Sequence, residues 1–232
     1  MTKTSIIIIH SLPDKKIKSL GNKALINIGT ENVIDYQIGF CNKLAKNNEI
    51  IVIGAFESKK LQKYLNKKYP KVKYISHRLT EFTNIGLGLQ YGVEYAMGDN
   101  LIIMNGNILI EQAAVSKIKQ HIKQKHNFLI TTRQSKSNVG FINHEDGTIA
   151  NCFFDLPKPL YDLFYIDSIY RNTFSDMIHN RDFEKHYLFE IINESINTNI
   201  TFRSVEIDSR NIHLIDNNET INKFIRKRKR YV

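Results

Sequence analysis

Short apolar runs alternate with helix-like segments in the first half of this chain, and that alternation limits the possible folds more than any other feature. The runs are rich in β-branched residues, as buried strands are. They are Ser5–His10, Glu49–Ile53, Val72–Ser76, Leu101–Met104 and Phe128–Thr132. The segments between them have helical spacing and are Glu31–Asn48, with Thr30 as N-cap, Ser58–Lys68, Asn84–Met97 and Ala113–Lys125. This order predicts βαβ units and a mostly parallel sheet.

The pattern changes after Thr132, where strand-like segments follow one another without an intervening helix. Val139–Ile142 and Thr148–Phe154 flank a Glu-Asp-Gly turn, which predicts an antiparallel hairpin. The remaining expected elements are a strand at Leu160–Ile166, helices at Ser168–Ile178 and Phe183–Asn197, a strand at Ile200–Ile207 and a closing helix at Asn217–Lys229, capped near Asp216 or Asn217. No repeat or flexible linker interrupts the chain. We therefore expect one α/β domain over residues 1–232, with antiparallel strands added in its C-terminal part.

Composition narrows the class of protein. No apolar run approaches the ~20 residues that a membrane-spanning helix needs. The two cysteines, Cys41 and Cys152, give neither a disulfide framework nor metal-ligand spacing, so we expect a cytoplasmic protein. Lys and Arg outnumber Asp and Glu by 33 to 23, a balance that suits anionic ligands such as nucleotides or nucleic acid.

Four stretches carry a family resemblance. They are Lys23–Gly29 followed by Val33–Ile38, Thr83-Asn84 followed by Leu87–Ala96, the strand and turn Leu101–Leu109, and Val205–Asp208 followed by Ile212–Glu219. In this order they resemble the sugar-phosphate nucleotidyltransferases, including the branch that resembles phosphocholine cytidylyltransferase. The resemblance extends from Ile6 to Ile225.

The resemblance implies a Rossmann-like, GT-A-type α/β/α sandwich of three layers with a mixed, mostly parallel sheet. Members of the family join a nucleoside triphosphate to a phosphorylated small molecule and release pyrophosphate. On this basis residues 1–132 form the nucleotide-binding half, and residues 133–232 form the half that binds the second substrate and closes the site. The resemblance also implies a homodimer.

Several residues match the family's site or lie beside it. Lys23 matches a lysine that contacts phosphate, and Asn107 stands where the family has a metal-binding Asp; these two are the expected catalytic positions. Expected nucleotide-binding residues are His10, Ser11, Leu12, Thr83, Asn84 and Gly86. Expected substrate-binding residues are Asp155, Lys158 and His213.

Several of these assignments have a structural alternative. Lys23 is equally well explained as a solvated lysine, and Thr83 and Asn84 are common helix N-caps. Asp155 also fits a plain acid at a strand end. His10 and His213 either converge with Asn107 in a rearranged polar site or form ordinary hydrogen bonds near strand ends.

The sequence departs from the family at three places that all serve the same metal-assisted reaction. Asn107 replaces the metal-binding Asp, and the second metal-binding acid aligns with Leu214. The first loop, which is glycine-rich in the family, contains no glycine between Ser11 and Leu20. Mg²⁺ is usually held through carboxylates, so no residue is assigned as a metal ligand, and Mg²⁺ is expected only if the site retains activity.

Three functions remain open. The chain is a divergent or catalytically inactive nucleotidyltransferase-like protein that binds a nucleoside triphosphate or nucleotide-sugar, or it is an active divergent enzyme. The third is a basic scaffold that binds a protein or a nucleic acid, the latter through the cationic run Arg226–Arg230. The usual explanation of such a run is a solvated helix end.

Overall fold

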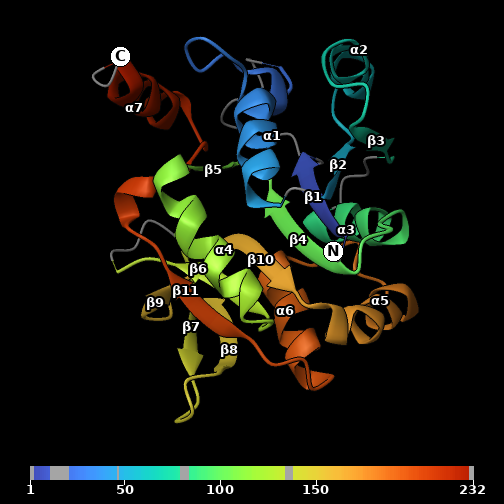
Figure 1. Cartoon of the computed structure of the whole chain (residues 1–232), viewed down its shortest axis with the longest axis vertical. Coiled ribbons are helices and arrows are strands. Elements are labelled where there is room, and N and C mark those ends of the chain that lie inside the picture. The colour runs from blue at the N-terminus through green and yellow to red at the C-terminus, as the bar shows by residue number, and fades with distance from the viewer. Residues whose placement is uncertain (1–2, 11–20, 46, 79–83, 134–137, 230–232) are drawn as a thin grey trace.

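The computed structural model describes residues 3–10, 21–45, 47–78, 84–133 and 138–229. Within them, a central sheet has seven strands in the order β11-β6-β10-β4-β1-β2-β3 (Figure 1). These are β1 Thr4–His10, β2 Asn48–Gly54, β3 Lys73–Ser76, β4 Asn100–Asn105, β6 Phe128–Thr131, β10 Tyr161–Ile166 and β11 Arg203–Glu206. Strands β4, β1, β2 and β3 run parallel, as do β6 and β11, whereas β10 is antiparallel to both of its neighbours. The predicted mixed, mostly parallel sheet is confirmed.

Helices cover both faces of this sheet because its strands are apolar on both sides. Ile6 and Ile8 of β1 pack in one core cluster with helices α1 Val33–Leu44, α2 Ser58–Lys68 and α4 Val115–Lys123. Ile7 and Ile9 pack in a second cluster with α3 Ile85–Glu94, α5 Arg171–Asn180 and α6 Leu188–Asn197. Alternate side chains of one strand therefore serve opposite layers, and the α/β/α sandwich is confirmed.

Two smaller sheets flank the central one. β5 Ile108–Ile110 pairs antiparallel with β12 Ile212–Leu214, and β7 Val139–Asn143 pairs with β8 Ile149–Phe154 and β9 Lys158–Pro159. The predicted hairpin is therefore present. Helix α7 Asn218–Lys229 closes the chain, and single 3-10 turns lie at Lys23–Leu25, Gln112–Ala114, Ser168–Tyr170 and Ser209–Asn211. No helix within the described ranges is both long and apolar enough to cross a membrane.

Three local predictions are corrected by backbone hydrogen bonding. Helix α1 is capped by Asn32, not Thr30, because the Asp35 carboxylate accepts a hydrogen bond from the Asn32 N–H. The predicted helix at 183–197 begins only at Leu188, since the carbonyls of Glu184 and His186 instead accept from the N–H groups of Asn84 and Gly86 at the start of α3, in the same layer. Strand β5, which follows the turn after β4, is not among the expected strands.

Strand β10 has a position that its sequence does not indicate. It lies between β4 and β6, so a strand from beyond residue 133 occupies the middle of the sheet (Figure 1). Its pairing with β6 shifts register between Tyr161 and Phe164. Irregularities of this kind re-aim side chains, and Asp162 lies inside this one.

Candidate functional site

The turn after β4 lies where two parallel strands end together. Ile9 of β1 pairs with Asn105 of β4, and the Gly106 N–H donates to the Ile9 carbonyl over 2.8 Å. Open α/β sheets bind ligands outside the carboxyl ends of their strands. The turn Asn105–Asn107 therefore stands at the edge where a ligand is expected.

The side chain of Gln37, on α1, holds this turn in place through hydrogen bonds. Its side-chain Nε2 donates to the carbonyls of Gly106 and Ile108, over 3.1 and 3.0 Å. The amide oxygen then faces the Nε2 of His10 at 2.8 Å. Because an amide oxygen only accepts hydrogen bonds, the hydrogen of His10 is on Nε2, and its Nδ1 carries a lone pair.

His10 is a buried, neutral histidine. Burial lowers the pKa of His10 to about 4, the hydrogen bond with Gln37 opposes that change, and the charge of Lys23 adds to it. Its Nδ1 is buried, and no residue in the described ranges donates a hydrogen bond to it. A Cβ at residue 106 would lie 2.4 Å from this nitrogen, so the imidazole fills the space that a side chain at 106 would occupy. The sequence predicts a glycine turn here, and the structure supplies the reason.

Four polar side chains form a connected row beyond this turn. Asn105 Nδ2 donates to Asp162 Oδ2 over 2.9 Å, and Asn107 Nδ2 donates to Asp216 Oδ1 over 3.2 Å. The Asn107 N–H reaches Asn105 Oδ1 at 3.3 Å and links the two pairs. The side-chain oxygen of Asn107 is buried and has no hydrogen-bond donor among the described residues. The edge thus carries two carboxylates, although the family's Asp is absent at 107.

Burial raises the pKa of the Asp162 carboxyl; the hydrogen bond from Asn105 opposes this change, and the negative charge of Asp216 reinforces it. This acid was not among the predicted site residues. Its signal in the sequence is an acid inside the apolar run Leu160–Ile166. Leu214, the position aligned with the family's second acid, packs against the core, and the carboxylate beside Asn107 comes from Asp216.

A second polar network ties α7 to the rest of the molecule. Glu111 accepts hydrogen bonds from His213 at 3.0 Å, Lys227 at 3.1 Å and Tyr36 at 3.2 Å. The structure thus places His213 in this network and shows no contact between it and Asn107 within the described residues. Tyr36, Glu111 and Lys227 of this network line a cavity of about 760 Å³, which Arg210 and Arg228 also line.

The Glu111 network predicts an acid-sensitive contribution to stability. The pKa of Glu111 is lowered to about 2, chiefly by the hydrogen bond from His213, with partial burial opposing and Lys227 assisting. A carboxyl whose pKa is lower in the folded protein stabilises it fully above its unfolded pKa near 4.5, and this stabilisation is lost as the pH falls toward 2. We expect the Glu111 carboxylate to contribute about 1–2 kcal/mol to the free energy of unfolding at neutral pH, because the group is partly exposed and solvent weakens its interactions.

Urea unfolding of wild type and Glu111→Gln, at pH 7 and pH 3, measures this contribution. The difference between the two proteins should be largest at pH 7 and shrink at pH 3. Glu219→Gln is the matched control, because Glu219 pairs with Lys223 on the exposed face of α7. Equal pH dependence of the Glu111→Gln variant and wild type would contradict the assignment.

The remaining predicted site residues lie at the start of α3 and around the end of β8 and β9. Asn84 is the N-cap of α3, and its side chain accepts from the Ile85 N–H at 2.8 Å. Gly86 is buried, and its N–H donates to the His186 carbonyl at 3.2 Å. Asp155 is an exposed turn residue with φ +57°, and Lys158 lies 5.9 Å from the ring centre of Phe141. Ser11, Leu12, Thr83 and Arg230 lie outside the described residues.

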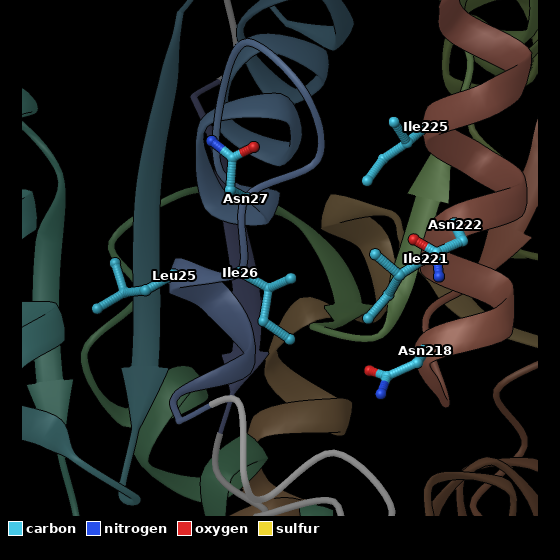
Figure 2. A pocket seen from close by; sticks show the side chains of 7 residues that line it. All are labelled: Leu25, Ile26, Asn27, Asn218, Ile221, Asn222 and Ile225. Atoms are coloured by element: carbon cyan, nitrogen blue, oxygen red, sulfur yellow. The ribbon is translucent and has the colours of Figure 1, made fainter.

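Lys23 lies in the 3-10 turn that follows the first loop, where its charge acts on His10. The residues that follow Lys23, from Leu25 to Asn27, form one wall of a groove of about 430 Å³, and α7 forms the other wall. Figure 2 shows Ile26 and Ile221 pointing toward one another across it, with asparagine side chains at its edges. The groove is apolar inside, unlike the row of polar side chains around Asn107.

The cationic C-terminal run is partly used inside the protein. Lys227 binds Glu111, and Arg228 pairs with Glu31 at 2.9 Å. The Arg228 guanidinium also stacks near Tyr36 and Phe224, at 5.2 and 5.8 Å from the ring centres. These contacts hold α7 against α1. They also engage Lys227 and Arg228 within the protein, although both belong to the cationic run that the sequence offers to a nucleic acid.

Comparison with family models gives a match, whereas comparison with curated proteins gives none. A family model described as nucleotidyl transferase matches residues 18–162. No curated protein matches the chain in sequence.

Solved structures share its fold at low identity. A CTP:phosphocholine cytidylyltransferase from Streptococcus pneumoniae has a TM-score of 0.77 and 15% identity, over 98% of this chain and 99% of that one. An inositol-1-phosphate CTP transferase from T. maritima has a TM-score of 0.76 and 13% identity, over 100% and 98%. A glucose-1-phosphate thymidylyltransferase assigned in Bacillus anthracis has a TM-score of 0.76 and 12% identity, over 97% and 94%.

Proposed function

We propose, since this chain belongs to the nucleotidyl transferase family, that it binds a nucleoside triphosphate or a nucleotide-sugar at the carboxyl ends of β1 and β4. The observation that carries the proposal is the polar row from Asp162 to Asp216 at this edge. Lys23 would contribute positive charge to phosphate binding from the neighbouring turn. We treat residues 1–232 as one nucleotidyltransferase-like domain.

The class of the second substrate follows from the similar structures. The proteins compared are named for phosphocholine, inositol 1-phosphate and glucose 1-phosphate as partners of a nucleotide. Each is a small alcohol or sugar that carries one phosphate. We propose a ligand of this class for the region near Asp155 and Lys158, which follow strand β8.

Catalysis has diverged in this proposal. Asn107 is neutral where the family has a metal-binding Asp, and the first loop has no glycine between Ser11 and Leu20. Phosphoryl chemistry depends on fixed positive charge around the phosphates. Loss of an acid and of a glycine-rich loop therefore supports weak or absent transfer activity alongside retained nucleotide binding.

Retained transfer activity is the second candidate, and Asp216 favours it. Mg²⁺ binds oxygen ligands, mainly carboxylates, and Asp216 with the donor-free oxygen of Asn107 fits such an ion. Within the described residues no group of three or more His, Cys, Asp or Glu side chains is arranged for a metal, so the donor set is small. When bound, Mg²⁺ would neutralise charge on the phosphates of the nucleotide.

A nucleotide screen tests the proposal. CTP, UTP, GTP, ATP and dTTP are each added with and without Mg²⁺, and binding is followed by thermal shift and calorimetry. At a hundred times its dissociation constant a ligand adds about 2.7 kcal/mol, which raises the melting temperature by roughly 5–10 °C in a protein of this size. We expect at least one nucleotide to do so. No response to any of the five would refute nucleotide binding.

Two further measurements refine that result. Lys23→Ala should weaken binding of the nucleotide that responds in the screen about tenfold, through loss of a charge-assisted contact. Lys43→Ala, which removes an exposed lysine at the end of α1, should leave that binding unchanged.

Release of pyrophosphate in the presence of a phosphorylated alcohol or sugar distinguishes the two candidate functions, because it requires active transfer.

A further inference from the structure

We propose that Asp162 is a ligand for a divalent cation, shared with Asp216 and the side-chain oxygen of Asn107, and that it supplies the carboxylate which position 107 lacks. This inference rests on the proposed function, because the cation would accompany the phosphates of a bound nucleotide. Asp162 lies on β10, outside every stretch that resembles the family's motifs.

The sheet brings Asp162 to the turn by strand pairing. β10 runs antiparallel to β4 with Leu163 opposite Met104, so Asp162 comes beside Asn105 at the last residue of β4. The hydrogen bond from Asn105 to Asp162 confirms this position. On its other side β10 loses register with β6 between Tyr161 and Phe164. An irregular strand next to a ligand edge is a common way to aim a side chain.

The surroundings of Asp162 do not otherwise explain a carboxylate. Its neighbours Tyr161, Leu163 and Phe164 are buried in the two apolar clusters. A half-buried acid is costly unless it is paired, and among the described residues Asp162 has one donor, the neutral amide of Asn105. Within the part of the chain that the structure describes, no Lys, Arg or His forms an ion pair with Asp162 or Asp216. A cation between them would balance both charges.

Asn107 gives an independent indication of a ligand. Its Nδ2 donates to Asp216, but its Oδ1 is shielded from solvent and accepts no hydrogen bond from any residue that the structure describes. A buried acceptor without a donor costs about 1–3 kcal/mol, and such a group needs an explanation such as an ion. An amide oxygen and two carboxylates are hard donors that suit Mg²⁺ or Mn²⁺ and not a thiol-seeking metal.

Mn²⁺ binding measures the proposal directly, since the signal of free Mn²⁺ in electron paramagnetic resonance falls as the ion binds. Wild type, Asp162→Asn and Asp216→Asn are titrated with Mn²⁺ in the absence of nucleotide, and then with the nucleotide identified by the screen. We expect each substitution to weaken Mn²⁺ binding at least tenfold. Asp99→Asn is the matched control, because Asp99 immediately precedes β4, at the end of that strand opposite Asn105, and its carboxylate accepts a hydrogen bond from the Lys3 N–H.

Folding is checked separately. Removing an unpaired, half-buried charge should leave the metal-free melting temperature of Asp162→Asn unchanged or higher, while Mn²⁺ should raise the melting temperature of wild type more than that of the variant. Equal Mn²⁺ affinity in wild type, Asp162→Asn and Asp99→Asn would overturn the inference, as would the absence of Mn²⁺ binding in wild type. Nucleotide binding in EDTA is measured in parallel: if it is present in either of those cases, the proposed function stands while the cation site fails.

Discussion

Replacing Gln37 by leucine is expected to destabilise the protein by about 3–5 kcal/mol. Gln37 Nε2 donates to the carbonyls of Gly106 and Ile108, and its Oε1 accepts from His10. All of these groups lie in a buried region, where each polar atom left without its partner costs about 1–3 kcal/mol. Urea unfolding gives the free energy, and in a chain of 232 residues the melting temperature should fall by roughly 8–15 °C.

A spectroscopic signal separates this network from a general packing effect. The Nε2 hydrogen of His10 should give a slowly exchanging imidazole resonance in wild type, and that resonance should be lost in Gln37→Leu. In Gln37→Glu a carboxylate faces His10, so the pKa of His10 should rise from about 4. Gln62→Leu on the exposed side of α2 serves as the control. A Gln37→Leu protein with wild-type stability would show that the turn is held by other contacts.

Local patterns predict the elements of this fold better than their arrangement. The β-branched run Ile6–Ile9 and the helix Ser58–Lys68 were predicted because their burial follows from short-range spacing: β1 is buried on both faces, and only Leu61 and Leu65 of α2 are buried. The central position of β10 was not predicted. Tyr161–Ile166 would be equally apolar at the edge of a sheet, and pairing with β4 depends on contacts distant in sequence.

The candidate site was also predicted only in part. The Asn105–Asn107 turn was found from its strand and glycine, because both signals are local. Alignment with the family directed attention to Leu214, whereas the carboxylate beside Asn107 comes from Asp216. Asp162 was missed, since only the three-dimensional pairing of β10 and β4 brings its carboxylate to the turn.

Gly86 was interpreted as a nucleotide-binding residue, and the structure suggests a test of that interpretation. A Cβ at this position would lie 2.0 Å from the carbonyl oxygen of Phe183, a backbone atom that cannot rotate away. Relief requires displacement of the Phe183–His186 segment, whose carbonyls at 184 and 186 accept hydrogen bonds from Asn84 and Gly86. Overpacking of this kind costs about 1–3 kcal/mol, and loss of two buried hydrogen bonds adds about 1 kcal/mol each.

Gly86→Ala should therefore lower the free energy of unfolding by about 3 kcal/mol, even after the gain of up to ~1 kcal/mol in helix propensity from glycine to alanine. Gly39→Ala isolates that gain, because Gly39 lies in α1 where, apart from the adjacent backbone of that helix, no atom of the described residues lies within 4 Å of a new Cβ, and it should be neutral or slightly stabilising. Denaturant unfolding of both variants provides the comparison. If Gly86→Ala kept wild-type stability but lost nucleotide binding, the glycine would serve the ligand; if it lost stability, the glycine is required for packing of α3 on the segment before α6.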